Sequence, residues 1–259
     1  MQDRLQHSST AKNKSERIMD ISKKKIAAFD LDGTITQHRT PVSDEHYALL
    51  SEMAKKYKIL MVGAGMCDRI FHQLREFPVD IIGCYGMQFC TYNKETKSLD
   101  TVYSEAQPCD RESVKARARE ICDRHGYTNQ AGELVCFHAS GAVTIALLGN
   151  DAKIEDKLKF DPDRKKRRAF YDEVVAAFPD YNVFVGGSSS FDMAPKPYNK
   201  FFALDRYCRE NNLSHDEVVF FGDDYGTGGN DECVYLSDFD FVCVDDYRKL
   251  CDALAPFLK

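Results

Sequence analysis

The feature that most constrains the fold is an apolar run that ends abruptly in two carboxylates, residues 26–34 (IAAFDLDGT). Its first four residues are typical of a strand buried on both faces of a parallel sheet. Ligands of open α/β sheets bind just beyond the carboxyl ends of the strands, so we expect Asp30 and Asp32 at the rim of a crevice. Because unpaired buried carboxylates are costly, a cation is their expected partner.

The same residues allow a simpler interpretation, because Asp and Gly are ordinary turn residues and could follow a strand without any chemical role. A calcium-binding EF-hand loop is excluded, since it requires Gly at position six and Glu at position twelve. Here Gly33 is the fourth residue and Pro41 the twelfth. The stretch alone favours a phosphoryl-transfer site but leaves the acidic turn open.

The composition is that of a globular protein whose 259 residues suffice for one large domain or two smaller ones. A net charge of −6 gives no general attraction to nucleic acid or to anionic membranes, and no apolar stretch is long enough to span a bilayer. The N-terminal residues lack the apolar segment of a signal peptide. Ten cysteines without C-x-x-C spacing argue against zinc and favour reduced thiols. We therefore expect a cytoplasmic protein with neither a nucleic-acid nor a membrane partner.

Strands and helices alternate at both ends of the chain, which predicts a doubly wound parallel sheet. In the first part, strands are expected at 26–29, 58–62 and 79–82, with helices after Ser43 and at 67–76. In the last part, the expected elements are a helix after Asn199, strands at 218–221 and 239–244, and a helix from about 246. Residues 1–22 are polar without a period, which predicts a disordered or loosely docked tail.

The middle of the chain has a different pattern, which predicts an inserted α+β cap with an antiparallel sheet. A hairpin at 87–103 comes before it, and the cap itself is expected to contain helices at 110–126 and 169–178 and strands at 135–138, 142–147 and 181–185. The predicted domains are an α/β core, residues 23–104 and 193–259, and a cap, residues 105–192. The charge run 161–168 (DPDRKKRR) is expected to be a solvated loop leading into a helix, with attraction of a substrate phosphate as the alternative.

A second strand end carries acids in the same way as the first. The apolar run 218–221 is followed by Gly222 and Asp223, and a Gly-rich loop then leads to Asp231 at the expected start of a helix. These acids could be a turn residue and a helix cap, but two strand-end acid clusters in one parallel sheet favour a shared site. Lys200 would complete a phosphate site, although a lone Lys is usually solvated.

Together these motifs resemble those of the haloacid dehalogenase superfamily. The residues that carry the resemblance are Asp30-Leu31-Asp32-Gly33-Thr34 (first motif), Lys200 (third), and Gly222-Asp223 with Gly229-Asn230-Asp231 (fourth). The insert between the second and third motifs resembles a type C2 cap, as in subfamily IIB. Within that group, residues 186–192 and 220–231 are most similar to eukaryotic-type phosphomannomutases, and the likeness covers about residues 25–258.

The resemblance implies a role for each matching residue. Asp30 would be the nucleophile that forms an aspartyl-phosphate, and Asp32 the general acid and base. Mg²⁺ would bind the Asp30 carboxylate, the Asp32 backbone carbonyl and Asp223, while Asp231 would hold a metal-bound water. Lys200 would balance the charges of the phosphate and of Asp30.

Substrate positions follow from the same resemblance. Arg39 in a core loop, and Ser190 and Asp192 at the end of the cap, match residues that bind substrate in the family. The implied partner is a small phosphorylated metabolite. Because mutases of this branch pair through their caps, a homodimer is an open alternative.

The second motif departs from the family pattern. Its strand normally ends in a Ser or Thr that hydrogen-bonds the phosphate, whereas this chain has Gly63, Ala64 and Gly65, with Gly65 in the place of the hydroxyl. Backbone N–H groups of this loop could replace the hydroxyl as an anion-binding nest.

The cap departs further. Three arginines that would clamp a second phosphate in a mutase align with Ala139, Asn150 and Lys157. Lys157, Lys159 and Arg164 are candidate replacements. We therefore expect a Mg²⁺-dependent phosphohydrolase acting on a phosphosugar or similar metabolite, and the alternative is a phosphomannomutase or phosphoglucomutase. A catalytically impaired binding protein on the same fold is the third hypothesis, which the intact acids and Lys200 oppose.

Overall fold

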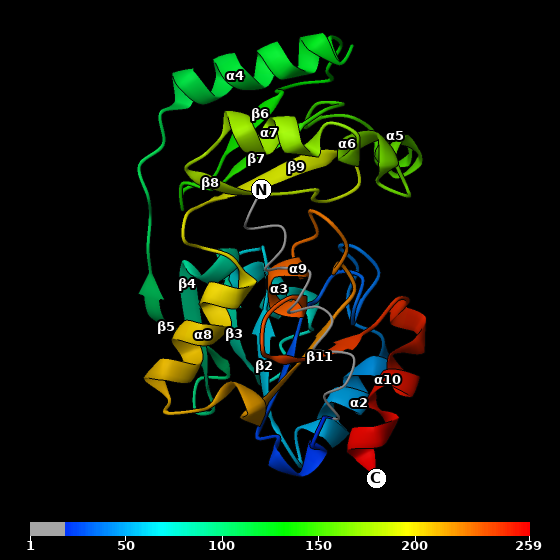
Figure 1. Cartoon of the computed structure of the whole chain (residues 1–259). Coiled ribbons are helices and arrows are strands. Elements are labelled where there is room, and N and C mark those ends of the chain that lie inside the picture. The colour runs from blue at the N-terminus through cyan, green and yellow to red at the C-terminus, as the bar shows by residue number, and fades with distance from the viewer. Residues whose placement is uncertain (1–18) are drawn as a thin grey trace.

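A computed structural model describes residues 19–259. They form a core around a seven-stranded sheet and a cap around a four-stranded sheet, with the cap above the core in Figure 1. The predicted tail, residues 1–22, lies outside the described part except for its last four residues, and Ile21–Lys23 form a 3-10 helix, η1. No helix within residues 19–259 is long and apolar enough to cross a membrane.

The core sheet has the strand order β11-β10-β1-β2-β3-β4-β5. Its strands are β1 (Ile26–Phe29), β2 (Lys58–Val62), β3 (Asp80–Gly83), β4 (Gln88–Asn93), β5 (Ser98–Ser104), β10 (Val218–Gly222) and β11 (Asp240–Cys243). Neighbours from β11 to β3 pair in parallel, and β4 and β5 add an antiparallel hairpin at one edge. The predicted α/β class with a parallel core is confirmed.

Helices cover both faces of the core sheet because its central strands are apolar on both sides. On β1, Ala27 and Phe29 pack into a cluster with α2 (Asp44–Met53), α3 (Cys67–Gln73) and α10 (Leu250–Leu258). Ile26 and Ala28 pack on the opposite face with α8 (Lys200–Glu210) and α9 (Glu232–Tyr235). Burial of all four β1 residues fixes this strand in the middle of the sheet.

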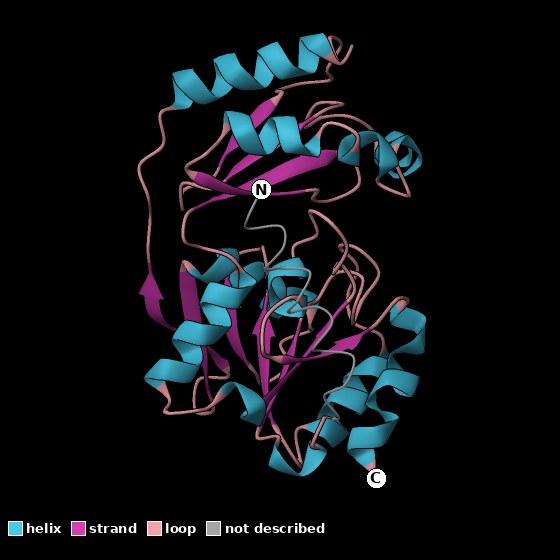
Figure 2. Ribbon diagram, in the orientation of Figure 1, coloured by secondary structure: helices cyan, strands magenta, loops and turns pink. Residues whose placement is uncertain are grey.

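The cap sheet is antiparallel, with the order β6-β7-β9-β8. Its strands are β6 (Val135–Phe137), β7 (Val143–Ala146), β8 (Tyr181–Phe184) and β9 (Ser190–Pro195), and its helices are α4 (Arg111–Arg124), α5 (Ile154–Phe160), α6 (Lys165–Arg168) and α7 (Tyr171–Ala177). Helices α4 and α7 lie on the side of the sheet away from the core (Figure 2). Side chains alternate along β9, so Phe191 and Met193 enter the cap interior while Ser190 and Asp192 face the cleft beneath.

Helices α5 and α6 and strand β9 of the cap were not predicted. Helix α5 has only seven residues and buries none of its side chains, so its apolar pair Ile154 and Leu158 is too short a pattern to predict a helix. Strand β9 begins in a Gly- and Ser-rich segment. Its polar residues Ser190 and Asp192 face the cleft, so the strand has no continuous apolar run.

The prediction of a solvated loop for the charge run 161–168 was wrong in part. Asp161 and Arg167 are only 2% and 1% exposed. Arg167 Nε donates to Asp161 Oδ2 at 2.9 Å, and Nη1 donates to the carbonyls of Gly186 and Ser190 at 2.5 and 2.9 Å. A buried guanidinium needs such acceptors, and here it ties α6 to the loop before β9.

Removal of Arg167 should therefore destabilise the protein. Arg167→Ala leaves Asp161 buried without its cation, and breaking a buried pair costs about 3–5 kcal/mol. The matched control is Lys165→Ala on the same helix, where the side chain is 83% exposed and the expected change is below about 0.5 kcal/mol. Urea unfolding measures both variants, and equal free energies of unfolding would contradict the structural role given to Arg167.

Candidate active site

The carboxyl ends of three neighbouring strands bring the predicted acids together. Asp30 follows β1, Gly63 follows β2 and Asp223 follows β10, and these strands are adjacent in the order β10-β1-β2. The Asp30 N–H still donates to the carbonyl of Phe221 at 2.9 Å, so the sheet fixes the backbone of this residue. The acids consequently lie at the sheet edge that faces the cap.

Lys200 is the cation at the centre of this arrangement. It is the first residue of α8, whose N-cap is Asn199, and it is fully buried. Its Nζ lies 2.7 Å from Asp30 Oδ1 and 2.6 Å from Asp231 Oδ1, and it donates to Asn230 Oδ1 at 2.8 Å. Burial acts to lower the pKa of Lys200, but the charges of Asp231 and Asp30 outweigh it and raise the pKa. The ammonium is therefore charged at neutral pH.

The acid cluster carries more negative charge than Lys200 can offset. Oxygen atoms of Asp30, Asp223 and Asp231 lie within 4.8 Å of one another. Burial, together with the charge of Asp231, raises the pKa of Asp30 to about 6 despite Lys200. Burial and the charges of Asp30 and Asp231 raise the pKa of Asp223 to about 8. Such a set of crowded carboxylates fits Mg²⁺, which prefers oxygen ligands.

Asp231 and Asp223 differ in how many of their carboxylate oxygens are free to bind a metal. Asp231 pairs with Lys200 through Oδ1 and accepts from the Asp224 N–H through Oδ2 at 3.0 Å, so protein donors already occupy both oxygens. Asp223 accepts one hydrogen bond, from Thr34 Oγ1 at 3.0 Å. Asp30 and Asp223 are therefore the residues that would hold Mg²⁺, with Asp231 behind them.

Gly33 is required by the close approach of the two acid clusters. Its φ is +100°, and a Cβ at this position would lie 2.4 Å from Asp223 Oδ2. Any side chain would push Asp223 away from Asp30. Gly33 therefore allows the turn after β1 to lie in direct contact with Asp223, the acid that follows β10.

Asp32 points to a separate set of donors. Its Oδ1 accepts from the Arg39 N–H at 2.7 Å and from Gln73 Nε2 at 2.6 Å, and its Oδ2 lies 3.2 Å from Arg69 Nη1. Burial acts to raise the pKa of Asp32, but these hydrogen bonds and the Arg69 charge lower it below its ordinary value. The carboxylate is therefore ionised at neutral pH and able to accept a proton.

The cap closes over these acids and leaves a cleft of about 900 Å³. The predicted site residues that line it are Asp30, Asp32, Arg39, Gly63, Ala64, Gly65, Ser190, Asp192 and Asp223. Lys200 and Asp231 lie buried beneath its floor. On the cap side, Thr144 Oγ1 donates to Asp192 Oδ1 at 2.9 Å, while burial raises the pKa of that carboxyl. All the predicted site residues therefore gather at one place, between the core and the cap.

Known proteins share both the sequence pattern and the fold. Residues 123–248 match the family model of eukaryotic phosphomannomutase. Phosphomannomutases of Nicotiana benthamiana and Schizosaccharomyces pombe are 28% and 26% identical to the chain, over 82% of its length and 85% and 86% of theirs. The chain is therefore similar to phosphomannomutases over most of its length.

Solved structures support the fold of this phosphomannomutase-like chain. IMP-bound, N-terminally truncated IMP-nucleotidase of Plasmodium falciparum superposes with a TM-score of 0.64 at 14% identity, over 98% of this chain and 79% of that one. A structure described as showing a trigonal-bipyramidal intermediate in a phosphoryl-transfer superfamily gives 0.57 at 18% identity, over 90% and 98%. These likenesses show that the chain shares the fold of these proteins.

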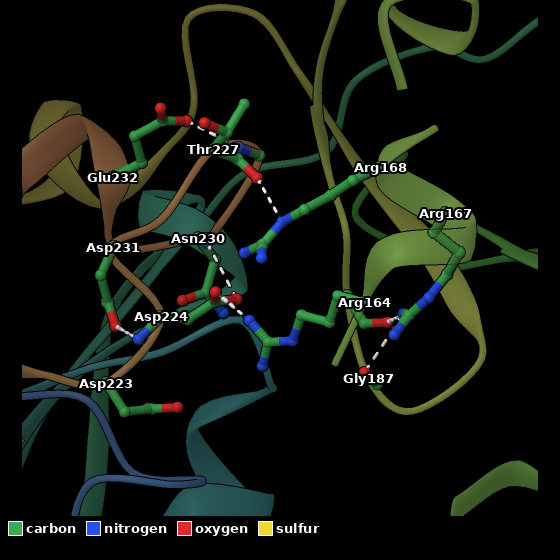
Figure 3. A network of polar contacts seen from close by, with 12 residues as sticks. Arg164, Arg167, Arg168, Gly187, Asp223, Asp224, Thr227, Asn230, Asp231 and Glu232 are labelled. Atoms are coloured by element: carbon green, nitrogen blue, oxygen red, sulfur yellow. Dashed lines mark hydrogen bonds and ion pairs between the residues drawn. The ribbon is translucent and has the colours of Figure 1, made fainter. Parts of the chain in front are cut away.

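Sequence reasoning about this phosphomannomutase-like chain named Arg164 as a candidate clamp but did not name Arg69, Gln73 or Arg168. Figure 3 shows two arginines that reach from the cap to the core: Arg164 pairs with Asp224, and Arg168 Nε donates to the carbonyl of Thr227 at 3.0 Å. Gln73 and Arg69 hold Asp32 from α3. Their position four residues apart on one helix face was a usable signal, whereas nothing in the run 161–168 indicates that Arg168 reaches the core.

Mg²⁺ should stabilise the protein through Asp223. At a concentration one hundred times its dissociation constant, a ligand adds about 2.7 kcal/mol to the free energy of unfolding, and Asp223→Asn should remove most of this gain. The matched control is Asp123→Asn on α4, an exposed cap acid that should leave the gain unchanged. Thermal unfolding with and without Mg²⁺ measures it, and an undiminished gain in Asp223→Asn would contradict the assignment.

The gain from Mg²⁺ should also depend on pH. Protons compete with the metal for carboxylates whose pKa values are raised, here to about 6 for Asp30 and about 8 for Asp223. Both acids are ionised above these values, so Mg²⁺ binding should tighten as the pH rises from 6 to 8. Calorimetric titration tests the sign, and tighter binding at pH 6 than at pH 8 would contradict it.

Proposed function

We propose that the enzyme is a Mg²⁺-dependent hexose-phosphate mutase that interconverts the 1- and 6-phosphates of a mannose-type sugar. The observation that carries this proposal is that cationic side chains from both domains enter one cleft above Asp30. The names of the sequence relatives support it and favour the mutase, the sequence-based alternative, over the hydrolase.

In the proposed reaction, a carboxylate oxygen of Asp30 attacks one phosphorus of a hexose bisphosphate. The bond between phosphorus and the sugar oxygen breaks, and that oxygen receives the proton that Asp32 accepted from the sugar hydroxyl in the other half of the cycle. The aspartyl-phosphate then gives its phosphoryl group to the free hydroxyl of a hexose monophosphate, whose proton passes to Asp32. Bound Mg²⁺ would offset the negative charge of the phosphoryl group during both transfers.

Lys200 prepares Asp30 for this attack. Its charge opposes the burial that raises the Asp30 pKa, so that Asp30 is ionised above about pH 6. The 2.7 Å contact also fixes one oxygen and thereby orients the other. Asp32 is held in place by Gln73 and by the Arg39 N–H, which suits a residue that moves protons without binding the metal through its side chain.

A mutase must also hold the phosphate that is not at Asp30, whichever end of the sugar it occupies. Arg39 lines the cleft from the core, and Arg164 and His138 line it from the cap. Of the candidate replacements for the missing clamp, Lys157 donates from Nζ to the Asn150 carbonyl at 2.8 Å. Neither Lys157 nor Lys159 lines the cleft, so Arg164 is the replacement that the geometry supports.

The second candidate is a phosphohydrolase that acts on a sugar monophosphate. It is favoured by the cap positions that lack guanidinium groups: Ala139 lines the cleft without a donor side chain. Asn150 uses its Oδ1 to accept from the Glu133 N–H at 2.8 Å. A weaker hold on a second phosphate would leave the aspartyl-phosphate open to water.

Bisphosphate dependence separates the two candidates. With Mg²⁺ and mannose 1-phosphate, ³¹P NMR should show the 6-phosphate forming when catalytic glucose 1,6-bisphosphate is present and not without it. Asp30→Asn should abolish the conversion because it removes the nucleophile. Release of one equivalent of inorganic phosphate without bisphosphate would contradict the mutase and favour the hydrolase.

Arg164→Met should raise the KM for the bisphosphate about tenfold, the loss of roughly one charge-assisted hydrogen bond. Lys157→Met is the matched control, since it removes a cap cation that does not line the cleft. Thermal unfolding checks that both variants are folded. Equal KM values for the two variants would show that Arg164 is not the clamp.

A further inference from the structure

We propose that the Arg69 guanidinium takes the place of the hydroxyl missing from the second motif and binds the phosphoryl group directly. The inference rests on the proposed transfer at Asp30, since it concerns the group being transferred. It assigns to this chain a phosphate ligand that replaces a Ser or Thr at position 65.

The position of the guanidinium relative to Gly65 carries the argument. A Cβ built on Gly65 would lie 2.3 Å from Arg69 Nη2, 2.4 Å from Nε and 2.7 Å from Cζ. These distances are far below any real van der Waals contact, so a side chain at 65 and the present position of Arg69 exclude each other. The guanidinium thus occupies the space in which a Ser or Thr side chain would begin.

The protein holds one edge of this guanidinium and leaves the other free. Arg69 Nη1 donates to Gln73 Oε1 at 2.8 Å and to Asp32 Oδ2 at 3.2 Å. Gln73 is itself fixed by hydrogen bonds from Nε2 to Asp32 Oδ1 and to Thr36 Oγ1 at 2.6 and 2.9 Å. No residue between 19 and 259 accepts a hydrogen bond from Nε or Nη2, the two nitrogens beside Gly65. Arg69 lines the cleft, so these donors are available to a ligand.

The chemistry of those donors suits a phosphoryl group. Nε and Nη2 form a planar fork that can donate two parallel hydrogen bonds to two phosphate oxygens, where a hydroxyl donates one. The positive charge also offsets the charge that a phosphate brings close to Asp30 and Asp32. Of the backbone N–H groups in this loop, that of Gly63 is not available to a phosphate, because it already donates to the Ile82 carbonyl at 2.9 Å.

The test is a double-mutant cycle with inorganic phosphate as the probe. Calorimetry in the presence of Mg²⁺ should show that Arg69→Ala weakens phosphate binding about tenfold or more, the effect of a lost charge-assisted pair. Gly65→Ser should weaken binding in the natural chain, because its side chain displaces the guanidinium. In the Arg69→Ala background, the same Gly65→Ser should tighten binding, because the hydroxyl enters the vacated space.

Two controls separate direct binding from indirect effects. Arg75→Ala removes an exposed arginine just after α3 that pairs with Asp44, and it should leave phosphate binding unchanged. If Arg69 acted only by positioning Asp32, its effect would vanish in an Asp32→Asn background. We expect the weakening by Arg69→Ala to persist there.

Three results would overturn the inference: unchanged phosphate binding in Arg69→Ala, the same effect of Gly65→Ser in both backgrounds, or no phosphate binding by the natural chain. The probe contains no sugar, so the outcome is independent of mutase activity. A chain that fails to isomerise hexose phosphates but loses phosphate binding in Arg69→Ala would contradict the proposed function and leave this inference standing.

Discussion

The contact of one buried ammonium with two buried carboxylates holds the site together. Burying Asp30 or Asp231 without a cation would cost several kcal/mol, and Lys200 meets both within hydrogen-bond distance. Through this contact the start of α8, the end of β1 and the loop after β10 are fixed relative to one another. Removal of the ammonium would leave two like charges facing each other in a dry environment, so the geometry of the whole catalytic edge depends on it.

The remaining charge imbalance explains the rest of the core site. With Lys200 shared between Asp30 and Asp231, the nearby Asp223 has no cation among the described residues, and its pKa rises to about 8. A divalent cation beside Asp223 would remove that imbalance. A phosphate that enters the cleft would then lie on the other side of this cation. Asp32 is kept out of the cluster by Gln73 and Arg69, which leaves it ionised for proton transfer. The two acids of one short motif therefore have opposite pKa shifts and different roles.

The cap determines what lies opposite these acids. Its sheet turns Ser190 and Asp192 toward the cleft because alternate residues of β9 pack into the cap interior. Arg167 ties α6 to the loop before β9, and from the adjacent turn Arg164 reaches the core acid Asp224 (Figure 3). The cap therefore places the Arg164 guanidinium in the cleft, opposite the core acids. In the proposed mutase, the core would carry the chemistry and this small group of cap residues would hold the substrate.

The core and its acids could be predicted from sequence, because each central strand is an apolar run that ends at an acid or a glycine. The expectation that Asp30 and Asp223 share a site follows from those ends, whereas the strand order was not predicted. The cap was harder, since α5 buries no side chain and β9 alternates buried apolar residues with Ser190 and Asp192. Arg69 was not named, and Arg164 could not be chosen over Lys157 and Lys159, because their roles depend on where a long side chain points. The backbone of Arg164 is left-handed, with a φ of +60°, and this changes the direction of the chain within residues 161–168. No sequence pattern signals that turn.

The central claim is that Asp30 carries the phosphoryl group, and trapping this intermediate tests it most directly. The enzyme is mixed with Mg²⁺ and ³²P-labelled hexose 1,6-bisphosphate, quenched in acid within milliseconds, reduced with borohydride and digested for mass spectrometry. The account predicts an acid-stable, hydroxylamine-sensitive label and a homoserine at position 30. Product formation with no label on the protein, or with the label on any other residue, would contradict it.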